Sequence, residues 1–212
     1  MMPKAQQIQQ ELTRGGLYHP SYEHDACGVG FIVHIKGQKS HKIVQDGIQI
    51  LLNLAHRGAC GCDPKTGDGA GILIQISHPF FSKQKLDFKL PAAGKYAVGM
   101  LFLPQDAGER AHCEKILSDI ISEEGFNLLG YRDVPTNNGD LGEEARDAEP
   151  FMRQVFVENN CDDQDAMERK LYLISKRAEH QVRALNLSEG KLFFIASFSS
   201  RTIVYKGMLL TE

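Results

Sequence analysis

The sequence contains no tryptophan, few cysteines and no excess of charge of either sign. Its 212 residues include 24 Lys and Arg against 27 Asp and Glu, which gives a formal charge of −3. A nearly balanced charge without a polybasic segment excludes a protein that is held to nucleic acid or to an acidic membrane by bulk charge. We therefore expect neither nucleic acid nor a membrane among its partners.

Long apolar runs are missing as well. Residues 192–198 form one of the longest, and they are far fewer than the roughly 20 residues that a membrane-spanning helix needs. The chain does not open with the charged and then apolar segments of a signal peptide, and its five cysteines are an odd number at irregular spacings. These absences exclude a secreted, disulfide-stabilised protein and indicate a cytoplasmic one.

The composition is that of a globular domain, with 42% hydrophobic and 24% charged residues. Residues 1–26 differ from the remainder because they are rich in glutamine and contain the helix breakers Gly15, Gly16 and Pro20. We interpret residues 1–26 as a leader resembling a propeptide and residues 27–212 as the folded part. Neither an internal repeat nor a low-complexity segment interrupts the folded part.

The spacing of apolar residues indicates alternating strands and helices. A β-branched and aromatic run with two glycines predicts a buried strand that begins at Cys27. Helices are predicted at 43–55, 107–121 and 167–185. Further strands are predicted at 72–76, 96–103, 127–134 and 153–157, with a polar loop at 135–150 and a hairpin formed by 191–199 and 202–205. Runs of strands separated by helices favour an α+β fold with two sheets covered by helices.

Several segments resemble, in the same order, the amino-terminal domain of the glutamate synthase large chains. These segments are residues 22–31, 56–59, 66–71, 149–157 and 199–208. The resemblance implies a class II glutamine amidotransferase with the four-layer αββα sandwich of the N-terminal-nucleophile hydrolases. It also implies that residues 27–212 are the N-terminal part of this domain, incomplete at the C-terminal end. The segments that grip the glutamine carboxylate and form the oxyanion hole are expected beyond Glu212.

The chemistry of such an enzyme accounts for a cysteine at the start of a strand. Removal of the leader would make Cys27 the first residue, and its α-amine, with an unperturbed pKa of about 8, would act as general base for its thiol. The thiolate would attack the side-chain amide of glutamine, ammonia would leave, and water would hydrolyse the thioester. Gly28 would leave room for the substrate. Without the resemblance, a single cysteine before a strand is more often a small buried hydrophobic residue.

Arg57 follows the first predicted helix and precedes a glycine. The resemblance places this element beside the nucleophile, which implies that Arg57 binds substrate or supports the site. By its spacing alone, Arg57 would be a cation that satisfies the last carbonyls of the helix. Residues 66–71 lack the Gly-Lys-Ser/Thr ending of a phosphate-binding loop and precede a strand. We therefore expect a tight glycine turn there, with Asp68 capping backbone amides.

Two further motifs favour ordinary structural interpretations. Cys60 and Cys62 flank one glycine, whereas structural zinc sites combine a Cys-x₂₋₄-Cys pair with a second ligand pair, so we expect no metal. The pair Asn138 and Gly139 resembles an oxyanion-hole dipeptide, but its place within a polar loop favours a turn.

The resulting hypothesis is the glutaminase portion of a glutamate synthase, with L-glutamine as substrate and ammonia transferred to 2-oxoglutarate. No cofactor is expected in this chain, whereas FMN and an iron–sulfur cluster are expected in the complete enzyme. The expected partners are the downstream synthase domains and a small electron-supplying subunit. Two alternatives stay open: a catalytically incomplete fragment, and a non-catalytic interaction module of the same fold.

Overall fold

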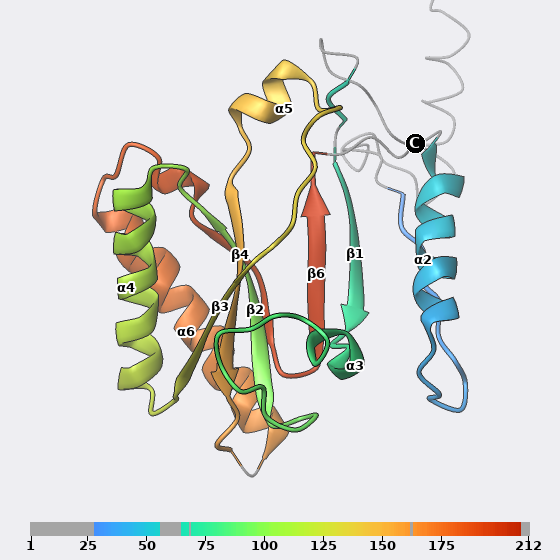
Figure 1. The fold of residues 1–212 in the computed structure, drawn as a ribbon, viewed down its shortest axis with the longest axis horizontal. Coiled ribbons are helices and arrows are strands. Elements are labelled where there is room, and N and C mark those ends of the chain that lie inside the picture. The colour runs from blue at the N-terminus through green and yellow to red at the C-terminus, as the bar shows by residue number, and fades with distance from the viewer. Residues whose placement is uncertain (1–27, 56–64, 68, 162, 209–212) are drawn as a thin grey trace, which may run out of the picture.

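The computed structural model of the protein describes residues 28–55, 65–67, 69–161 and 163–208 (Figure 1). The strands of these ranges are β1 (Ala70–Gln75), β2 (Tyr96–Leu103), β3 (Leu128–Asp133), β4 (Phe151–Glu158), β5 (Phe194–Ser199) and β6 (Thr202–Gly207). The helices are α2 (His41–Asn53), α3 (His78–Phe81), α4 (Ala107–Glu123), α5 (Glu143–Asp147), α6 (Gln164–Ala184) and the 3₁₀ helix η3 (Gly190–Leu192).

The strands form two antiparallel sheets. The larger sheet has the order β3-β4-β2-β5, and the smaller sheet pairs β1 with β6. In the larger sheet Val98 lies opposite Phe156, and in the smaller sheet Ala70 lies opposite Gly207. This arrangement confirms a mixed α and β fold with antiparallel sheets.

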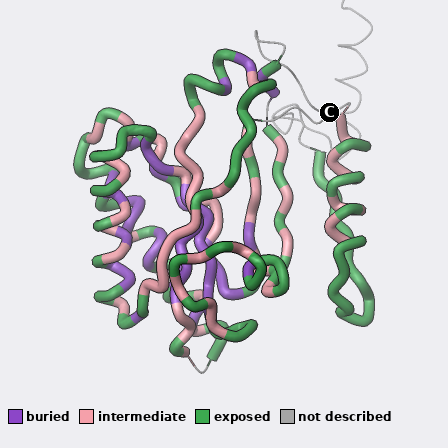
Figure 2. Tube along the Cα trace, in the orientation of Figure 1, coloured by how far each residue is buried: buried purple, intermediate pink, exposed green. Residues whose placement is uncertain are grey.

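Helices α4 and α6 cover one face of the larger sheet (Figure 1). The core between them is apolar and fully buried, with Leu117 of α4, Leu171 of α6 and Val155 of β4 at 0% exposure (Figure 2). Each helix begins at an aspartate side chain that accepts backbone N–H groups, Asp106 for α4 and Asp163 for α6. The predicted helices at 107–121 and 167–185 are thus confirmed.

The opposite face of the larger sheet packs against the smaller sheet. Val98 and Met100 of β2 and Phe156 of β4 meet Ile203 of β6 in a second buried cluster. Phe81 of α3 joins it with its ring edge against the ring of Phe156, at a centroid distance of 5.2 Å. The molecule therefore contains at least three layers: two helices, a four-stranded sheet and a two-stranded sheet.

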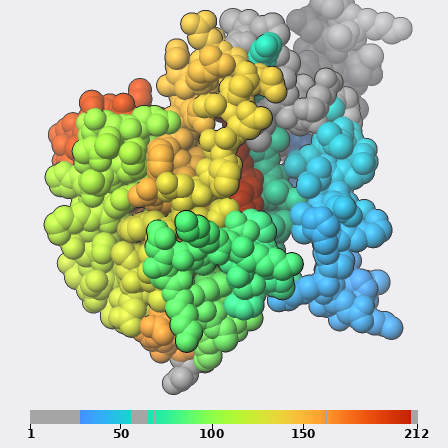
Figure 3. Space-filling model, in the orientation of Figure 1, coloured from blue at the N-terminus to red at the C-terminus, as the bar shows by residue number. Residues whose placement is uncertain are grey.

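Helix α2 lies beside β1 (Figure 1). A Cβ atom at Gly47 would be 3.1 Å from the Ile72 side chain, so a small residue lets the two elements approach. None of the residues of α2 is buried. The predicted helix at 43–55 is confirmed. Figure 3 shows α2 at the edge of the molecule, where it packs more loosely than α4 and α6.

The strand predicted to begin at Cys27 is wrong over its described part. Residues 28–35 belong to neither sheet and are exposed, as Figure 2 shows for the segment that leads into α2. A strand needs a neighbouring strand for its backbone hydrogen bonds. None of the six strands in the described ranges lies in register beside this segment, so its sequence pattern alone does not make it a strand.

The predicted hairpin at 191–205 is also wrong. β5 and β6 follow each other in the chain but belong to different sheets. The hydroxyl of Ser199 accepts hydrogen bonds from the backbone N–H groups of Arg201 and Thr202, and the hydroxyl of Ser197 accepts one from Val204. Serine side chains thus take the place of a strand ladder at the point where the chain crosses between sheets.

Candidate active site

Most of the predicted site residues lie outside the described residues. These are Cys27 and Arg57, together with His56, Cys60, Cys62 and Asp68. Gly28 is described, is exposed and belongs to no strand or helix. The segment that begins at residue 28, the carboxyl end of α2, the start of β1 and the end of β6 all lie at the same end of the molecule (Figure 1). The described residues that flank Cys27 and Arg57 in sequence therefore lie at one end of the molecule.

The glycine segment before β1 brings two strands unusually close. Gly69 has a φ of +114°, which favours glycine, and a Cβ atom there would be 3.2 Å from the Gly207 carbonyl oxygen. At Gly71 a Cβ atom would be 2.9 Å from Cβ of Lys206 and 3.1 Å from the carbonyl oxygen of Tyr205. The strand that the sequence predicts after these glycines is confirmed as β1, whereas Asp68, the predicted cap of a tight turn, lies outside the described residues.

Helix α5 fixes the residues that precede this turn. Thr66 and Gly67 are buried, and the Thr66 hydroxyl accepts a hydrogen bond of 3.3 Å from the backbone N–H of Ala145. The N–H of Gly142 donates to the carbonyl oxygen of Lys65 at 3.4 Å. Sequence reasoning assigned 135–150 to an irregular loop and missed α5, whose five residues are too few to show a helical repeat.

A buried polar network joins the two sheets. Gln154 of β4, at 0% exposure, donates to the Tyr205 hydroxyl at 3.1 Å and accepts from the Arg132 guanidinium at 2.9 Å. Arg132 also donates to the Gln84 side chain at 3.0 Å. Burial raises the pKa of Tyr205, so the phenol stays neutral. The network fixes β6 against the larger sheet. The end of β6 is the part of the chain that faces Gly69.

The structure describes the predicted turn at Asn138 and Gly139, and the contacts of Arg201. The carbonyl oxygen of Asn138 accepts a hydrogen bond from the Leu141 N–H at 3.3 Å, and its side-chain amide donates to Glu149 at 2.9 Å. The expected turn is therefore confirmed. Arg201 forms an ion pair with Asp165 at the start of α6, where it anchors the crossing between sheets.

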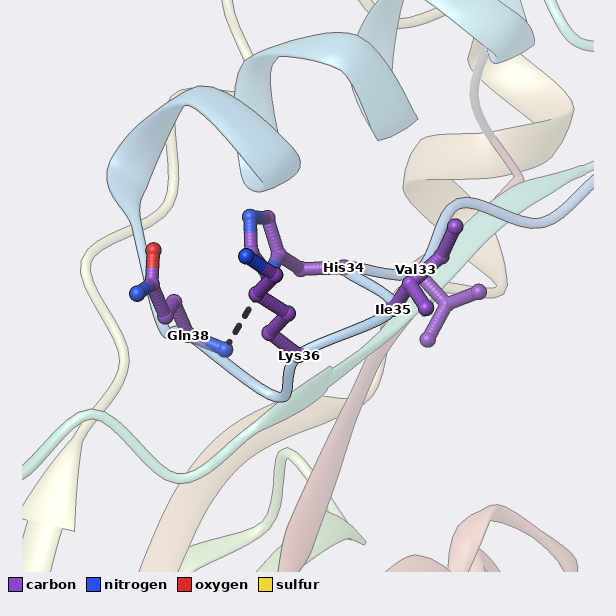
Figure 4. A pocket seen from close by; sticks show the side chains of 5 residues that line it. All are labelled: Val33, His34, Ile35, Lys36 and Gln38. Carbon is purple, nitrogen blue, oxygen red and sulfur yellow. Dashed lines mark hydrogen bonds between the residues drawn. The ribbon is translucent and has the colours of Figure 1, made fainter.

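A hollow of about 460 Å³ lies at the turn before α2, lined by Val33, His34, Ile35, Lys36 and Gln38 (Figure 4). The backbone N–H of Gln38 donates to the His34 ring at 3.3 Å, and all five lining residues are exposed. The hollow adjoins the amino end of α2, whereas Arg57 follows its carboxyl end. We therefore do not assign glutamine to this hollow.

Neither a metal centre nor a membrane-spanning segment is found in the part of the chain that the structure describes. No three His, Cys, Asp or Glu side chains gather there in an arrangement that could hold a metal ion. Among the same residues, every helix is too short or too polar to cross a bilayer.

The comparison with known families shows to which family the chain belongs. The sequence profile of the family described as glutamine amidotransferases class-II matches residues 27–212. The chain belongs to the class-II glutamine amidotransferases. The match of this amidotransferase chain to its family begins at the predicted nucleophile and includes both Arg57 and the glycine turn.

The relatives of this class-II amidotransferase include glutamate synthases. It is 46% identical to the glutamate synthase [NADPH] large chain of Bacillus subtilis, over 100% of this chain and 13% of the relative. It is 38% identical to the glutamate synthase [NADH] of Schizosaccharomyces pombe, over 98% of this chain and 10% of the relative. It is 39% identical to the ferredoxin-dependent glutamate synthase 2 of Arabidopsis thaliana, over 90% of this chain and 12% of the relative. The chain is thus homologous to the glutaminase portion of glutamate synthases and spans 13% or less of these relatives.

Proposed function

We propose that this chain is the glutaminase portion of a glutamate synthase. It hydrolyses L-glutamine to glutamate and ammonia, and the ammonia is transferred to 2-oxoglutarate in a downstream synthase domain. The observation that carries this proposal is that the family match begins at residue 27, the cysteine that the chemistry selects as nucleophile. The similarity to three kinds of glutamate synthase, which differ in the electron donor that their names give, supports the same role.

In the proposed mechanism, residues 1–26 are a leader whose removal frees the α-amine of Cys27. This amine takes the proton of the thiol and passes it to the amide nitrogen of glutamine, so that ammonia leaves as the thiolate forms a γ-glutamyl thioester. Water then hydrolyses the thioester, which releases glutamate and restores the thiol. Gly28 leaves space for the substrate, and Arg57 binds the substrate or supports the site. The turn at Gly69 lies at the same end of the molecule and forms part of the wall of the site.

We also propose that the domain is a four-layer αββα sandwich and that it works in the cytoplasm. The packing of α4 and α6 on the larger sheet, and of the smaller sheet on its other face, supports three of the layers. Helix α2, which contacts β1, supplies the start of the fourth.

The remaining partners belong to the complete enzyme. We propose that FMN and an iron–sulfur cluster belong to the downstream domains of the complete enzyme, as the similarity to glutamate synthases suggests. The downstream synthase domains and a small electron-supplying subunit are the proposed protein partners. NADPH, NADH and ferredoxin appear in the names of the relatives.

Release of ammonia from L-glutamine tests the proposal. We expect Cys27→Ala to lower the rate by roughly a thousandfold or more, because it removes the nucleophile. Cys161→Ala is the matched control, since Cys161 is half-buried and belongs to the loop before α6. Cys113 does not compete for the role, because burial raises the pKa of its thiol to about 11. Equal rates in Cys27→Ala and the unaltered chain would contradict the proposal.

The exposed apolar segment before α2 favours the second candidate, a non-catalytic interaction module of the same fold. This candidate predicts that the chain binds partner polypeptides without releasing ammonia. The assay above separates the two, because only the glutaminase depends on Cys27.

A further inference from the structure

The connection between α3 and β2 presents lysines to solvent. Residues 82–95 lie between these two elements and contain neither a helix nor a strand. Connections of more than about 12 residues without regular structure are uncommon in folded domains, and they often bind a ligand or a partner. The exposed lysines of this connection are Lys83, Lys85, Lys89 and Lys95. The first three of them are called the lysine row below.

The row has a fixed place because the residues between its members are anchored. Along the row, exposed residues alternate with half-buried ones. A Cβ atom at Gly130 of β3 would be 2.5 Å from the ring of Phe88, and this ring lies at a centroid distance of 5.2 Å from that of Phe156. The Gln84 side chain accepts a hydrogen bond of 3.0 Å from Arg132. The backbone of the row is therefore held against the core, while its ammonium groups lie in solvent.

The positive charge of the row is not balanced by nearby carboxylates. In the part of the chain that the structure describes, none of the three ammonium groups forms an ion pair. Asp87 is the one acidic residue of the connection, although the whole chain has a formal charge of −3. A partner that brings carboxylates to the row gains Coulomb attraction there and breaks no existing ion pair.

The number and setting of these charges select the class of partner. A short polypeptide in extended conformation carries every second side chain on one side, so alternate acidic residues present a matching row of carboxylates. A nucleic acid or an anionic membrane has a far larger and denser negative charge, which a chain with a net negative charge repels. Residues 82–95 also contain no arginine for bidentate contacts to phosphate. An acidic polypeptide is therefore favoured.

We propose that the lysine row is a docking surface for an acidic, extended segment of a partner polypeptide. Carboxylates of that segment pair with Lys83, Lys85 and Lys89, and Asp87 weakens the binding by repulsion. The connection runs across the front of the molecule, in green in Figure 3. It follows the end of β1, whereas the glycines of the candidate active site precede the start of β1. Docking here leaves that site open, and the inference does not depend on the proposed glutaminase.

Fluorescence anisotropy with a dye-labelled peptide tests the proposal. The probe is a peptide of about 12 residues in which glutamate alternates with serine, titrated with the 212-residue chain at about 50 mM salt, where surface charges are weakly screened. We expect the combined substitutions Lys83→Gln, Lys85→Gln and Lys89→Gln to weaken binding at least about tenfold. Asp87→Asn should strengthen it about two- to threefold. The same peptide with glutamine in place of glutamate should not bind measurably.

A second triple variant is the matched control. Lys36→Gln, Lys39→Gln and Lys191→Gln remove the same charge from exposed lysines elsewhere, and together they should weaken binding by less than about twofold. Circular dichroism checks that both triple variants keep the fold, which is expected because all six side chains are exposed.

Three results would overturn the proposal. The first is equal weakening in the two triple variants, which would show attraction by overall charge alone. The second is an affinity that Asp87→Asn leaves unchanged, and this comparison holds even if the row variant does not fold. The third is tighter binding of a phosphatidylserine vesicle or of a single-stranded oligonucleotide than of the peptide, which would assign the row to a lipid or to a nucleic acid. Ammonia release is not part of the readout, so none of these results bears on the glutaminase.

Discussion

Glycine at position 71 is required by the distance between two backbones. Its place opposite Lys206 in the β1–β6 pair leaves a Cβ atom only 2.9 Å from the Lys206 Cβ and 3.1 Å from a carbonyl oxygen. We expect Gly71→Ala to lower the free energy of unfolding by about 1–3 kcal/mol, because the strands must separate to admit the methyl group. Urea denaturation followed by circular dichroism measures the change.

Gly139→Ala is the control for this substitution. Gly139 lies in an exposed turn, its φ is outside the left-handed region, and a Cβ atom there would be 3.4 Å from its nearest neighbour, the Asn137 side chain. The control should change the free energy of unfolding by less than about 0.5 kcal/mol. Equal effects at the two positions would show that close approach is not the reason for glycine at 71.

Tyr205 is the second residue whose role follows from one contact. Its hydroxyl is the acceptor for the buried Gln154 amide. Tyr205→Phe should cost about 1–3 kcal/mol of stability, since it leaves a buried N–H without a partner. Tyr172→Phe, on the exposed face of α6, should have no measurable effect. Thermal unfolding of the two variants distinguishes this account from a general effect of losing a phenol.

At the scale of elements, α4 and α6 are held together by charge as well as by their apolar core. Glu124, just after α4, accepts from Lys170 at 2.6 Å and from Arg177 at 2.7 Å. The hydrogen bond from Lys170 has the largest effect, and together with the one from Arg177 it holds the pKa of the Glu124 carboxyl below its ordinary value of 4.5. Because the pKa of Glu124 is depressed in the folded state, the stabilisation that these ion pairs give is fully present above pH 4.5. It is lost as the pH falls through the lower pKa of the folded state.

We therefore expect Glu124→Gln to lower the stability at neutral pH by about 1 kcal/mol. The difference from the unaltered chain should shrink as the pH is lowered below 4.5 and through the depressed pKa of Glu124, because the carboxylate is then protonated. Urea denaturation at a series of pH values measures both effects. Glu143→Gln is the control, since Glu143 forms no ion pair among the described residues. A difference that stays constant with pH would contradict this role of Glu124.

Helices and strands whose own residues follow a regular apolar pattern are predictable from the sequence. The helical spacing of apolar residues predicts α4 and α6, and the apolar run at 96–103 predicts β2 with the bounds that the structure has. Pairing is not predictable in the same way. Residues 202–205 were expected to pair with β5, but β6 pairs with β1, because Ser197 and Ser199 satisfy the backbone where the chain crosses between sheets.

In the candidate site, too, features that depend on neighbouring residues are predictable, whereas contacts between residues far apart in the sequence are not. The glycines before β1 can be recognised in the sequence, because they lie close together and positive φ values such as that of Gly69 favour glycine. The network of Gln154 and Tyr205 cannot, since the two residues are 51 positions apart and meet only when two sheets pack. Cys27 and Arg57 come from motif resemblance and chemistry, and both lie outside the described residues.

At the scale of the whole molecule, the exposed apolar segment at residues 29–35 governs how the chain behaves in water. We expect the 212-residue chain to bind the dye ANS, because five large apolar side chains of this segment are exposed to water. Phe31→Asp should lower the dye fluorescence more than Tyr172→Asp, although both substitutions remove one exposed aromatic ring. Fluorescence titration at a protein concentration where the chain is monomeric makes the comparison. Equal losses would place the dye elsewhere.

The central claim is that Cys27 becomes the amino-terminal nucleophile of a glutaminase. The most direct test is the intact mass of the purified chain before and after treatment with a glutamine-analogue electrophile. The account predicts a mass that lacks residues 1–26, and one adduct that is located on Cys27 and is absent from Cys27→Ala. A full-length mass without an adduct, or an adduct that persists in Cys27→Ala, would contradict it.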